Sequence, residues 1–276
     1  MSIKYAYLGP AGTFTEAALL KIATREDQLI AYANVTAALN AVRSGECAKA
    51  LVPIENSVEG VVARTLDELA IGDPLVITAE TTLPVTFSLM TLEATQKSDI
   101  KIIATHPHAE SQCRSYIAKN FPNAQVIETT STAAAAKGLS KGEYDGAIAA
   151  PIAAKNYKLK VVAENIGDNT AAVTRFVVVE KPGTVGTPTG DDRTSLAVFI
   201  AIDHAGALLE VLNEFAKHQV NLTFIQSRPT GLELGHYHFI IDIQGHIDES
   251  PISAALAGLK VICEDIRFLG SYPQAK

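Results

Sequence analysis

The stretch Val-Thr-Arg-Phe-Val-Val-Val, residues 173–179, is typical of a buried β-strand that carries one polar pair. Side chains alternate between the two faces of a strand, so Val173 and Arg175 share one face while Thr174 and Phe176 share the other. An arginine inside an apolar run costs free energy unless a carboxylate or a bound anion compensates its charge. The strand therefore indicates either a structural partner for Arg175 or a site for a small anionic molecule.

Length and composition indicate a globular chain without a general affinity for polyanions. The 276 residues suffice for one large domain or two ordinary ones, and 47% of them are apolar while 19% are charged. The net charge of -7 argues against nucleic acid as a partner, because phosphate binding normally needs a basic surface. A small anion is not excluded, since a helix N-terminus or one arginine can bind it locally.

The cysteines and the N-terminus favour a cytoplasmic protein. Cys47, Cys113 and Cys263 are odd in number, far apart and without a C-x-x-C pair, so we expect reduced and mostly buried thiols. The first residues lack the apolar segment of a signal peptide. No apolar run approaches the ~20 residues of a membrane span, so no membrane association is expected.

A strand, a glycine turn and a capped helix open the chain. Residues 3–8 predict a strand, Gly9 to Gly12 break it, and Thr13 to Glu16 fit a capping box at a helix start. The first amides of such a helix can hold a carboxylate. The turn is not a dinucleotide fingerprint, because it has no G-x-G-x-x-G and no suitably placed acid.

The same unit recurs, which predicts a mostly parallel sheet. Further strands are expected at residues 48–53, 100–104, 125–128 and 147–150, each followed by a polar turn or a helix start. In parallel sheets, ligands bind beyond the carboxyl ends of the strands. The polar residues of these turns include Asn56, Ser57, Thr105 and His106.

The middle of the chain predicts two lobes. Residues 75–89 are strand-rich, interrupted by Pro84, and can cross from one lobe to the other. Residues 159–166 would then be the return crossing, which brings strand 173–179 back to the first lobe. We therefore expect two α/β lobes with a central cleft between them.

The C-terminal part has a different pattern. A Gly-, Pro- and Thr-rich linker precedes strands at residues 196–202, 222–227, 237–243 and 261–269, with helices after Gly206 and at residues 252–259. The order βαββαβ predicts a ferredoxin-like sandwich. His236 and His238 alternate on one of these strands and are expected to face solvent or an interface.

Together these stretches resemble the prephenate dehydratases of phenylalanine biosynthesis over nearly the whole chain. The similar motifs are Gly9-Pro-Ala-Gly-Thr-Phe-Thr-Glu-Ala-Ala18, Val52-Pro-Ile-Glu-Asn-Ser57 with Gly60, Thr105-His-Pro107 through Gln112-Cys113, and Thr174-Arg-Phe176. The C-terminal part is similar to an ACT domain. Four such motifs and the ACT-like part, five features in the right order, are far more specific than any one alone.

The resemblance implies a domain organisation and a set of roles. The catalytic domain would be residues 1–181, with lobe one at about 1–80 and 161–181 and lobe two at about 81–160, followed by a linker at 182–193 and the ACT domain at 194–276. Catalytic roles fall on Thr174, Asn56 and Gln112. Substrate contacts fall on Thr13, Ser57, Thr105, His106, Arg175 and Phe176. Phenylalanine-binding positions are Gly206, Ala207, Leu208, Gln226, Ser227, Arg228 and Pro229.

Two departures from the family's pattern bear on these roles. The family often has Asn two residues before the Thr of Thr-Arg-Phe, where this chain has Ala172. Its regulatory motif usually reads Glu-Ser-Arg-Pro, and Gln226 here keeps the shape of the glutamate but loses its charge. No chorismate-mutase-like helical segment precedes the catalytic part, so a monofunctional enzyme is expected.

The reaction implied is the loss of carbon dioxide and water from prephenate to give phenylpyruvate. Aromatisation drives it, so neither a metal nor a redox cofactor is expected. Hydroxide leaves poorly unless it receives a proton, which Thr174 would supply or relay. L-Phenylalanine is the implied effector, and a homodimer or homotetramer the implied assembly. The alternatives are an arogenate dehydratase and a non-catalytic, two-lobed binding protein or sensor.

Overall fold

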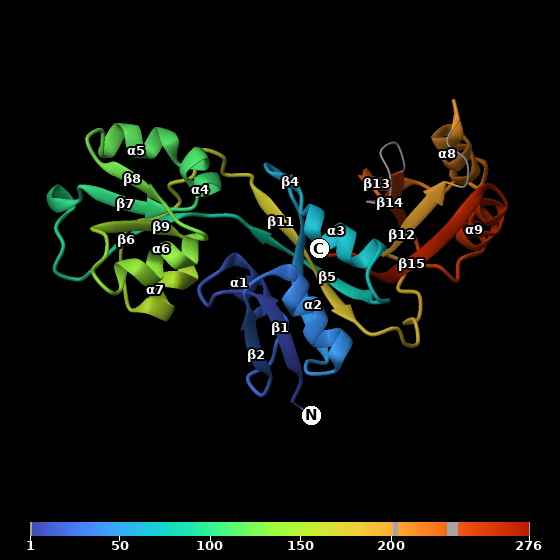
Figure 1. The fold of residues 1–276 in the computed structure, drawn as a ribbon, viewed down its shortest axis with the longest axis horizontal. Helices are drawn as coiled ribbons and strands as arrows, with labels where there is room; N and C mark the ends of the chain where they lie inside the picture. Colours follow the sequence, from blue (N-terminus) through green and yellow to red (C-terminus); the bar gives the residue numbers. More distant parts are fainter. Residues whose placement is uncertain (1, 201–203, 231–236, 276) are drawn as a thin grey trace. The chain divides into compact units, whose positions relative to one another are not determined.

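The chain packs as two compact units in a computed structural model that describes residues 2–200, 204–230 and 237–275 (Figure 1). The first unit comprises Met1–Ala38, Leu51–Val61 and Thr82–Phe176, and the second comprises Leu39–Ala50, Val62–Thr81 and Val177–Lys276. Among the described residues, no helix is long and apolar enough to cross a membrane.

The first sheet contains the strand predicted at residues 173–179. Its strands follow the order β2 (Gln28–Tyr32), β1 (Lys4–Leu8), β3 (Lys49–Asn56), β11 (Val173–Glu180) and β5 (Val76–Pro84), and the short β4 (Gly60–Val61) pairs with β3. The strands β1 and β2 are parallel. Every residue of β11 between its two ends is buried, as an apolar run with one polar pair predicts.

Three helices accompany this sheet in the sequence, namely α1 (Phe14–Leu19), α2 (Val35–Ser44) and α3 (Ala63–Ala70). The capping prediction is confirmed, because Thr13 Oγ1 accepts a hydrogen bond from the Glu16 amide at 3.3 Å. Glu16 reaches one residue further back than a standard capping box, and its carboxylate accepts from the Gly12 amide at 2.6 Å. The elements β2 and α2 are not among those predicted from the sequence.

The second sheet forms the other α/β lobe. Its order is β10 (Lys160–Ala163), β6 (Ser88–Thr91), β9 (Gly146–Ala149), β7 (Ile102–Thr105) and β8 (Gln125–Glu128). The strand β7 runs parallel to β8 and β9, whereas β6 is antiparallel to β9 and β10. The predicted mostly parallel sheet therefore has an antiparallel edge, which consists of β6 and β10.

Helices cover both faces of the second sheet. One apolar cluster joins the sheet to α4 (Pro107–Gln112) and α5 (Arg114–Asn120), and another joins it to α6 (Thr132–Leu139) and α7 (Pro151–Tyr157). In Figure 1 the first pair lies above the sheet and the second pair below it. Helix α4 begins at Pro107, which fits the helix start expected after strand 100–104, because Pro is favourable in the first turn of a helix.

The two crossings between the lobes differ in how well they are predicted. Residues 75–89 do cross, because β5 belongs to the first sheet and β6 to the second. Residues 159–166 are not the return crossing, because β10 is itself a strand of the second sheet. The chain returns only after Ala163 and enters β11 at Val173. A four-residue strand followed by polar loop residues leaves too little periodicity to distinguish the two cases.

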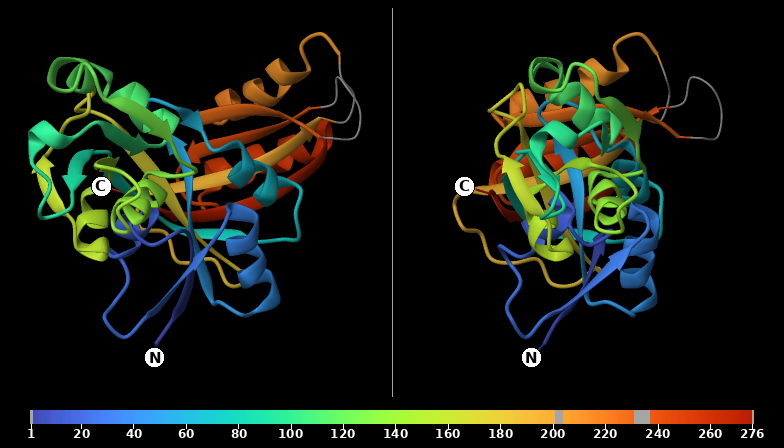
Figure 2. Two further views of the ribbon diagram at one scale, coloured as in Figure 1. Left: turned by 60° about the vertical axis from the view of Figure 1, so that its left-hand side comes forward. Right: turned by 90° about the vertical axis from the view of Figure 1, so that its left-hand side faces the viewer.

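The C-terminal part has the predicted βαββαβ order. It comprises β12 (Asp192–Ile200), α8 (Ala207–Lys217), β13 (Leu222–Pro229), β14 (Tyr237–Gln244), α9 (Ser250–Ile262) and β15 (Cys263–Pro273). The antiparallel sheet has the order β13-β14-β12-β15. Both helices pack on one face of it, as the views of Figure 2 show, and a single apolar cluster fills the space between.

Two predictions for this part need correction. Helix α9 continues to Ile262, three residues beyond the predicted end, and Ile262 packs against the same apolar cluster that buries Leu259. His238 does not face solvent: its side chain is fully buried and stacks on Phe199 at 5.1 Å between ring centroids. His236 lies outside the described residues.

Candidate active site

Thr174 and Asn56 form the centre of the candidate site, at neighbouring positions of β11 and β3. The side-chain amide of Asn56 donates to Thr174 Oγ1 at 2.7 Å, and Thr174 is 8% exposed. The amide orientation follows from its surroundings, since Asn56 Oδ1 accepts from the backbone amides of Val58 at 2.8 Å and Glu59 at 2.9 Å. The Thr174 oxygen is thus an acceptor toward Asn56, and its own proton is not committed to that bond.

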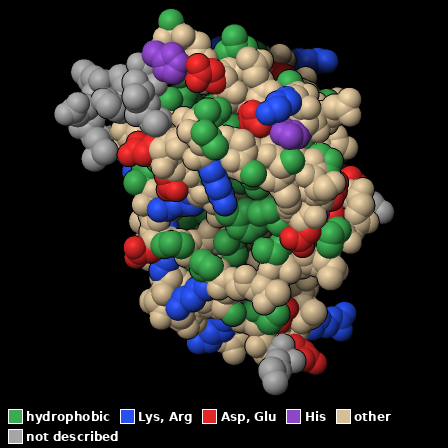
Figure 3. Space-filling model, turned by 90° about the vertical axis from the view of Figure 1, so that its right-hand side faces the viewer, with side chains coloured by type: hydrophobic (Ala, Val, Ile, Leu, Met, Phe, Trp, Pro, Cys, Tyr) green, Lys and Arg blue, Asp and Glu red, His purple; other side chains and the backbone are tan. Residues whose placement is uncertain are grey.

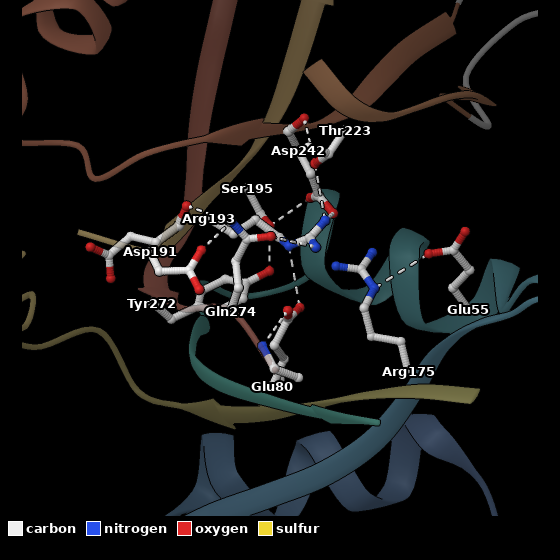
Figure 4. Close-up of polar contacts among 12 residues, drawn as sticks. Glu55, Glu80, Arg175, Asp191, Arg193, Ser195, Thr223, Asp242, Tyr272 and Gln274 are labelled. Carbon is white, nitrogen blue, oxygen red and sulfur yellow. Dashed lines mark hydrogen bonds and ion pairs between the residues drawn. The ribbon is translucent and has the colours of Figure 1, made fainter. Parts of the chain in front are cut away.

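Arg175 turns to the other face of β11 and meets a carboxylate there. Its Nε lies 3.3 Å from Glu55 Oε2, and the arginine side chain is 9% exposed (Figure 4). Glu55 and Asn56 are consecutive on β3, so strand alternation gives each of the two β11 residues its own partner. This is the structural-carboxylate alternative of the sequence analysis. A contact between Arg175 and substrate stays a prediction.

Ser57 extends the connection between β3 and β11. Its Oγ accepts from the Val173 amide at 3.0 Å, and its own amide donates to the Val173 carbonyl at 2.9 Å. The turn after β3 is therefore fixed to the start of β11 by both main-chain and side-chain bonds. These bonds place Asn56, Ser57 and Thr174 together, while the catalytic roles of Asn56 and Thr174 and the substrate contact of Ser57 stay predictions.

Gln112 reaches this turn from the second lobe. Its side-chain amide donates to Glu59 Oε1 at 2.9 Å, and His108 Nδ1, one turn earlier on α4, lies 3.2 Å from Glu59 Oε2. Four residues of separation place Gln112 and His108 on one face of the helix. Glu59 therefore brings the third predicted catalytic residue to the segment that holds Asn56.

Residues 5–184 match the family model "Prephenate dehydratase", and residues 194–260 match "ACT domain". A prephenate dehydratase of Amycolatopsis methanolica is 45% identical over 273 residues, which cover 99% of this chain and 89% of the relative. The chain belongs to the prephenate dehydratase family. Membership of this enzyme family also makes a non-catalytic binding protein the less favoured alternative.

Solved structures agree with the family. A prephenate dehydratase from Arthrobacter aurescens in complex with L-Phe has a TM-score of 0.93 and 48% identity, covering 99% of this chain and 90% of that one. A protein named GqqA, described as a novel type of quorum quenching acylase, has a TM-score of 0.87 at 26% identity, covering 98% and 97%. Because the fold is shared by proteins with different named activities, the activity must be argued from the site.

Thr13, a predicted substrate contact, serves as a helix cap. Its Oγ1 donates to the Leu8 carbonyl at 3.1 Å in addition to accepting from Glu16. The Glu16 carboxylate occupies the Gly12 amide and also accepts from Asn156 at 2.7 Å. The first amide of this turn therefore already has an anion as its partner, so a substrate contact by Thr13 stays a prediction.

Thr105, His106 and Phe176 also have structural roles. Thr105 is fully buried and donates to the Ile148 carbonyl at 2.8 Å. His106 is the N-cap of α4, where its Nδ1 accepts from the His108 amide, and burial lowers the pKa of its imidazole, helped by the nearby His108. Phe176 is 1% exposed. Their proposed contacts with substrate stay predictions.

The family's phenylalanine-binding positions lie at the start of α8 and along β13. Gly206 caps α8 with φ +98°, and no described residue lies within 4 Å of the position of an added Cβ. Gln226 donates to the carbonyl of Ser227, and Ser227 and Pro229 are exposed. Arg228 makes two bonds of 2.8 Å to the Asp67 carboxylate of α3, which raises its pKa. Ala207 is buried and Leu208 half-buried.

Sequence reasoning missed the carboxylates Glu55 and Glu59. Glu55 belongs to the polar turn expected after strand 48–53, whereas Glu59 lies beyond it, and neither has a local signal of its own. The burial of Arg175 called for a carboxylate, and strand alternation beside Asn56 could have pointed to Glu55. Nothing in the sequence near Glu59 indicates Gln112, which lies 53 positions away.

Proposed function

We propose that this protein converts prephenate to phenylpyruvate by decarboxylating dehydration, with Thr174 as the proton donor to the departing hydroxyl. The observation that carries the assignment is the 2.7 Å bond in which Asn56 donates to Thr174 Oγ1. A hydroxyl oxygen that already accepts one hydrogen bond is a better donor, and its proton is left for another partner. Asn56 is the positioning residue in this scheme.

The chemistry requires little beyond proton delivery and orientation. Aromatisation of the ring provides the driving force, and the barrier lies in expelling hydroxide, so a donor at ~2.6–3.2 Å from the ring hydroxyl is the central requirement. Thr174 is itself a weak acid and would relay a proton from water. The departing carboxylate should not be held tightly, because stabilising it in the ground state raises the barrier.

The remaining polar groups suit the substrate's other carboxylate. Gln112 supplies an amide donor from α4, His106 follows β7 of the second sheet, and Ser57 follows β3 of the first sheet. Turnover of prephenate, followed by the appearance of phenylpyruvate, tests the function. Arogenate, which carries an ammonium group as well, is the alternative substrate, so the ratio of kcat/KM for the two compounds decides between them. No turnover of either would reject the enzyme.

We further propose that L-phenylalanine binds the C-terminal domain and regulates catalysis. Support comes from the ACT family match and from the relative of Arthrobacter aurescens that was solved with L-Phe. The exposed Gly206 lets a ligand approach the backbone at the start of α8. Binding can alter activity only if phenylalanine favours one arrangement of the catalytic lobes over another.

Calorimetric titration of phenylalanine tests this site with a matched control. Gly206→Leu adds a side chain at φ +98°, and Gly142→Leu does the same at φ +79° in the loop after α6; no described residue lies within 4 Å of either added Cβ. We expect the first variant to lose phenylalanine binding and the second to retain it. Absence of binding to the parent protein, or equal binding by both variants, would show that the site is wrongly assigned.

A homodimer or homotetramer in the cytoplasm is the assembly we propose. In the ACT sheet β13 is an edge strand, and an edge is commonly protected by pairing with a second copy. Apolar side chains gather on the face drawn in Figure 3, which looks from the α8 and α9 side of Figure 1. Exposed apolar residues of this domain include Leu209, Ile225, Tyr237 and Val261. Sedimentation equilibrium measures the oligomeric state directly.

A further inference from the structure

The two carboxylate oxygens of Glu59 each contact a polar side chain of α4. Oε1 accepts from the Gln112 amide at 2.9 Å, and Oε2 lies 3.2 Å from His108 Nδ1. An amide N–H and an imidazole nitrogen on one helix face are also groups that a substrate carboxylate can use. Glu59 thus stands where the carboxylate of an anionic ligand of α4 would stand.

The backbone of Glu59 connects this contact to the catalytic hydroxyl. Its amide donates to Asn56 Oδ1 at 2.9 Å, and the same Asn56 side chain donates to Thr174 Oγ1 at 2.7 Å. One asparagine therefore fixes both the proton donor and the turn that carries Glu59. A ligand that displaces the Glu59 carboxylate from Gln112 would arrive beside this pair.

The contact is of a kind that exchanges readily. The side chains of Glu59 and His108 are 33% and 63% exposed. Exposed ion pairs contribute little to stability, about 0–1 kcal/mol. An incoming carboxylate can therefore displace Glu59 at a small cost in free energy. Displacing the carboxylate of Glu80, whose side chain is only 2% exposed, would cost more.

We propose that Glu59 is a specificity-determining residue. Its carboxylate holds Gln112 and His108 until a substrate carboxylate displaces it. After displacement, the negative charge of Glu59 opposes the binding of the doubly negative substrate. The proposal rests on the dehydratase function proposed above. Prephenate carries two carboxylates, whereas arogenate carries an ammonium group in addition. The Glu59 charge therefore penalises prephenate more than arogenate, and its removal should shift the preference toward prephenate.

Glu59→Gln tests the charge while it keeps the length of the side chain and its amide-accepting oxygen. We expect KM for prephenate to fall about three- to tenfold, as a charge interaction of partly exposed groups predicts. The ratio of kcat/KM for prephenate over arogenate should rise by a similar factor. Glu110→Gln is the matched control, because Glu110 is also 33% exposed and lies on α4, yet its ion-pair contact is with Arg114 at 3.9 Å. The control should change neither value more than twofold.

A second variant separates charge from structure. Glu59→Asp keeps the charge but shortens the side chain, so it should retain the parent's substrate preference even where its contact with Gln112 is lost. The dissociation constant for prephenate, measured in a Thr174→Ala background, should fall on adding Glu59→Gln. Failure of the parent to turn over prephenate would reject the function itself. A KM and dissociation constant that stay unchanged or rise in Glu59→Gln would overturn the Glu59 proposal alone.

Discussion

Asn56 and Thr174 are 118 positions apart in the sequence, and the Asn56 side chain donates a hydrogen bond of 2.7 Å to the Thr174 hydroxyl. The same asparagine accepts two backbone hydrogen bonds from the following turn. Both polar atoms of its side chain are thus engaged, and the Thr174 proton is not committed to the bond with Asn56.

Thr174→Ala removes the proposed proton donor. We expect kcat to fall by about 10²-fold or more, with a much smaller change in KM, because the bond matters mainly in the transition state. Steady-state kinetics with prephenate measure both values. Thr174→Ser keeps the hydroxyl and should retain more activity. An alanine variant within a few-fold of the parent would remove Thr174 from the mechanism.

Asn56→Asp replaces the donor to Thr174 by an acceptor of nearly the same shape. The Thr174 hydroxyl would then donate its hydrogen bond to this carboxylate instead of to the substrate, and the carboxylate adds a negative charge. We therefore expect kcat to fall by at least about tenfold. Its oxygens can still accept from the Val58 and Glu59 amides, so the melting temperature should change little. Equal kcat for Asn56→Asp and the parent would contradict the positioning role.

Arg193→Met tests a buried charge network of the second unit (Figure 4). The guanidinium lies 3.3 Å from Glu80 and 3.4 Å from Asp242, whose side chains are 2% and 1% exposed. Removing the cation leaves two buried carboxylates without its charge, so unfolding free energy should fall by about 3 kcal/mol. Urea denaturation measures the loss. Adding Glu80→Gln to Arg193→Met should recover part of it, and a double variant that is less stable still would contradict this account.

His238→Phe tests the buried imidazole through the pH dependence of stability. Burial lowers the pKa of His238, opposed by Asp67 and assisted by Arg228. The unfolded state therefore takes up a proton near pH 6.5 before the folded state does, and stability present above that pH is lost as the pH falls further. The parent should show a steeper decline than the variant between pH 7 and 5, by at most about 1.4 kcal/mol per pH unit. Parallel curves from urea denaturation would exclude this contribution.

The fold class could be predicted from local patterns, because each signal is carried by residues near one another in the chain. The alternation of 173–179 indicated a buried strand, the Thr13 cap indicated a helix start, and the βαββαβ order indicated the C-terminal sandwich. The return crossing was misplaced because β10 is short and half-buried, so its pattern resembles that of a connecting segment.

The sequence by itself determined the family and the order of most elements, and it named candidate residues for the site, since motifs and periodicity are properties of neighbouring positions. Only the tertiary structure decided which partner each residue has. It joins Thr174 to Asn56, Arg175 to Glu55 and Gln112 to Glu59, through pairs that lie far apart in the chain. Such pairings depend on strand order and on how helix α4 meets the turn after β3, and no local propensity specifies either.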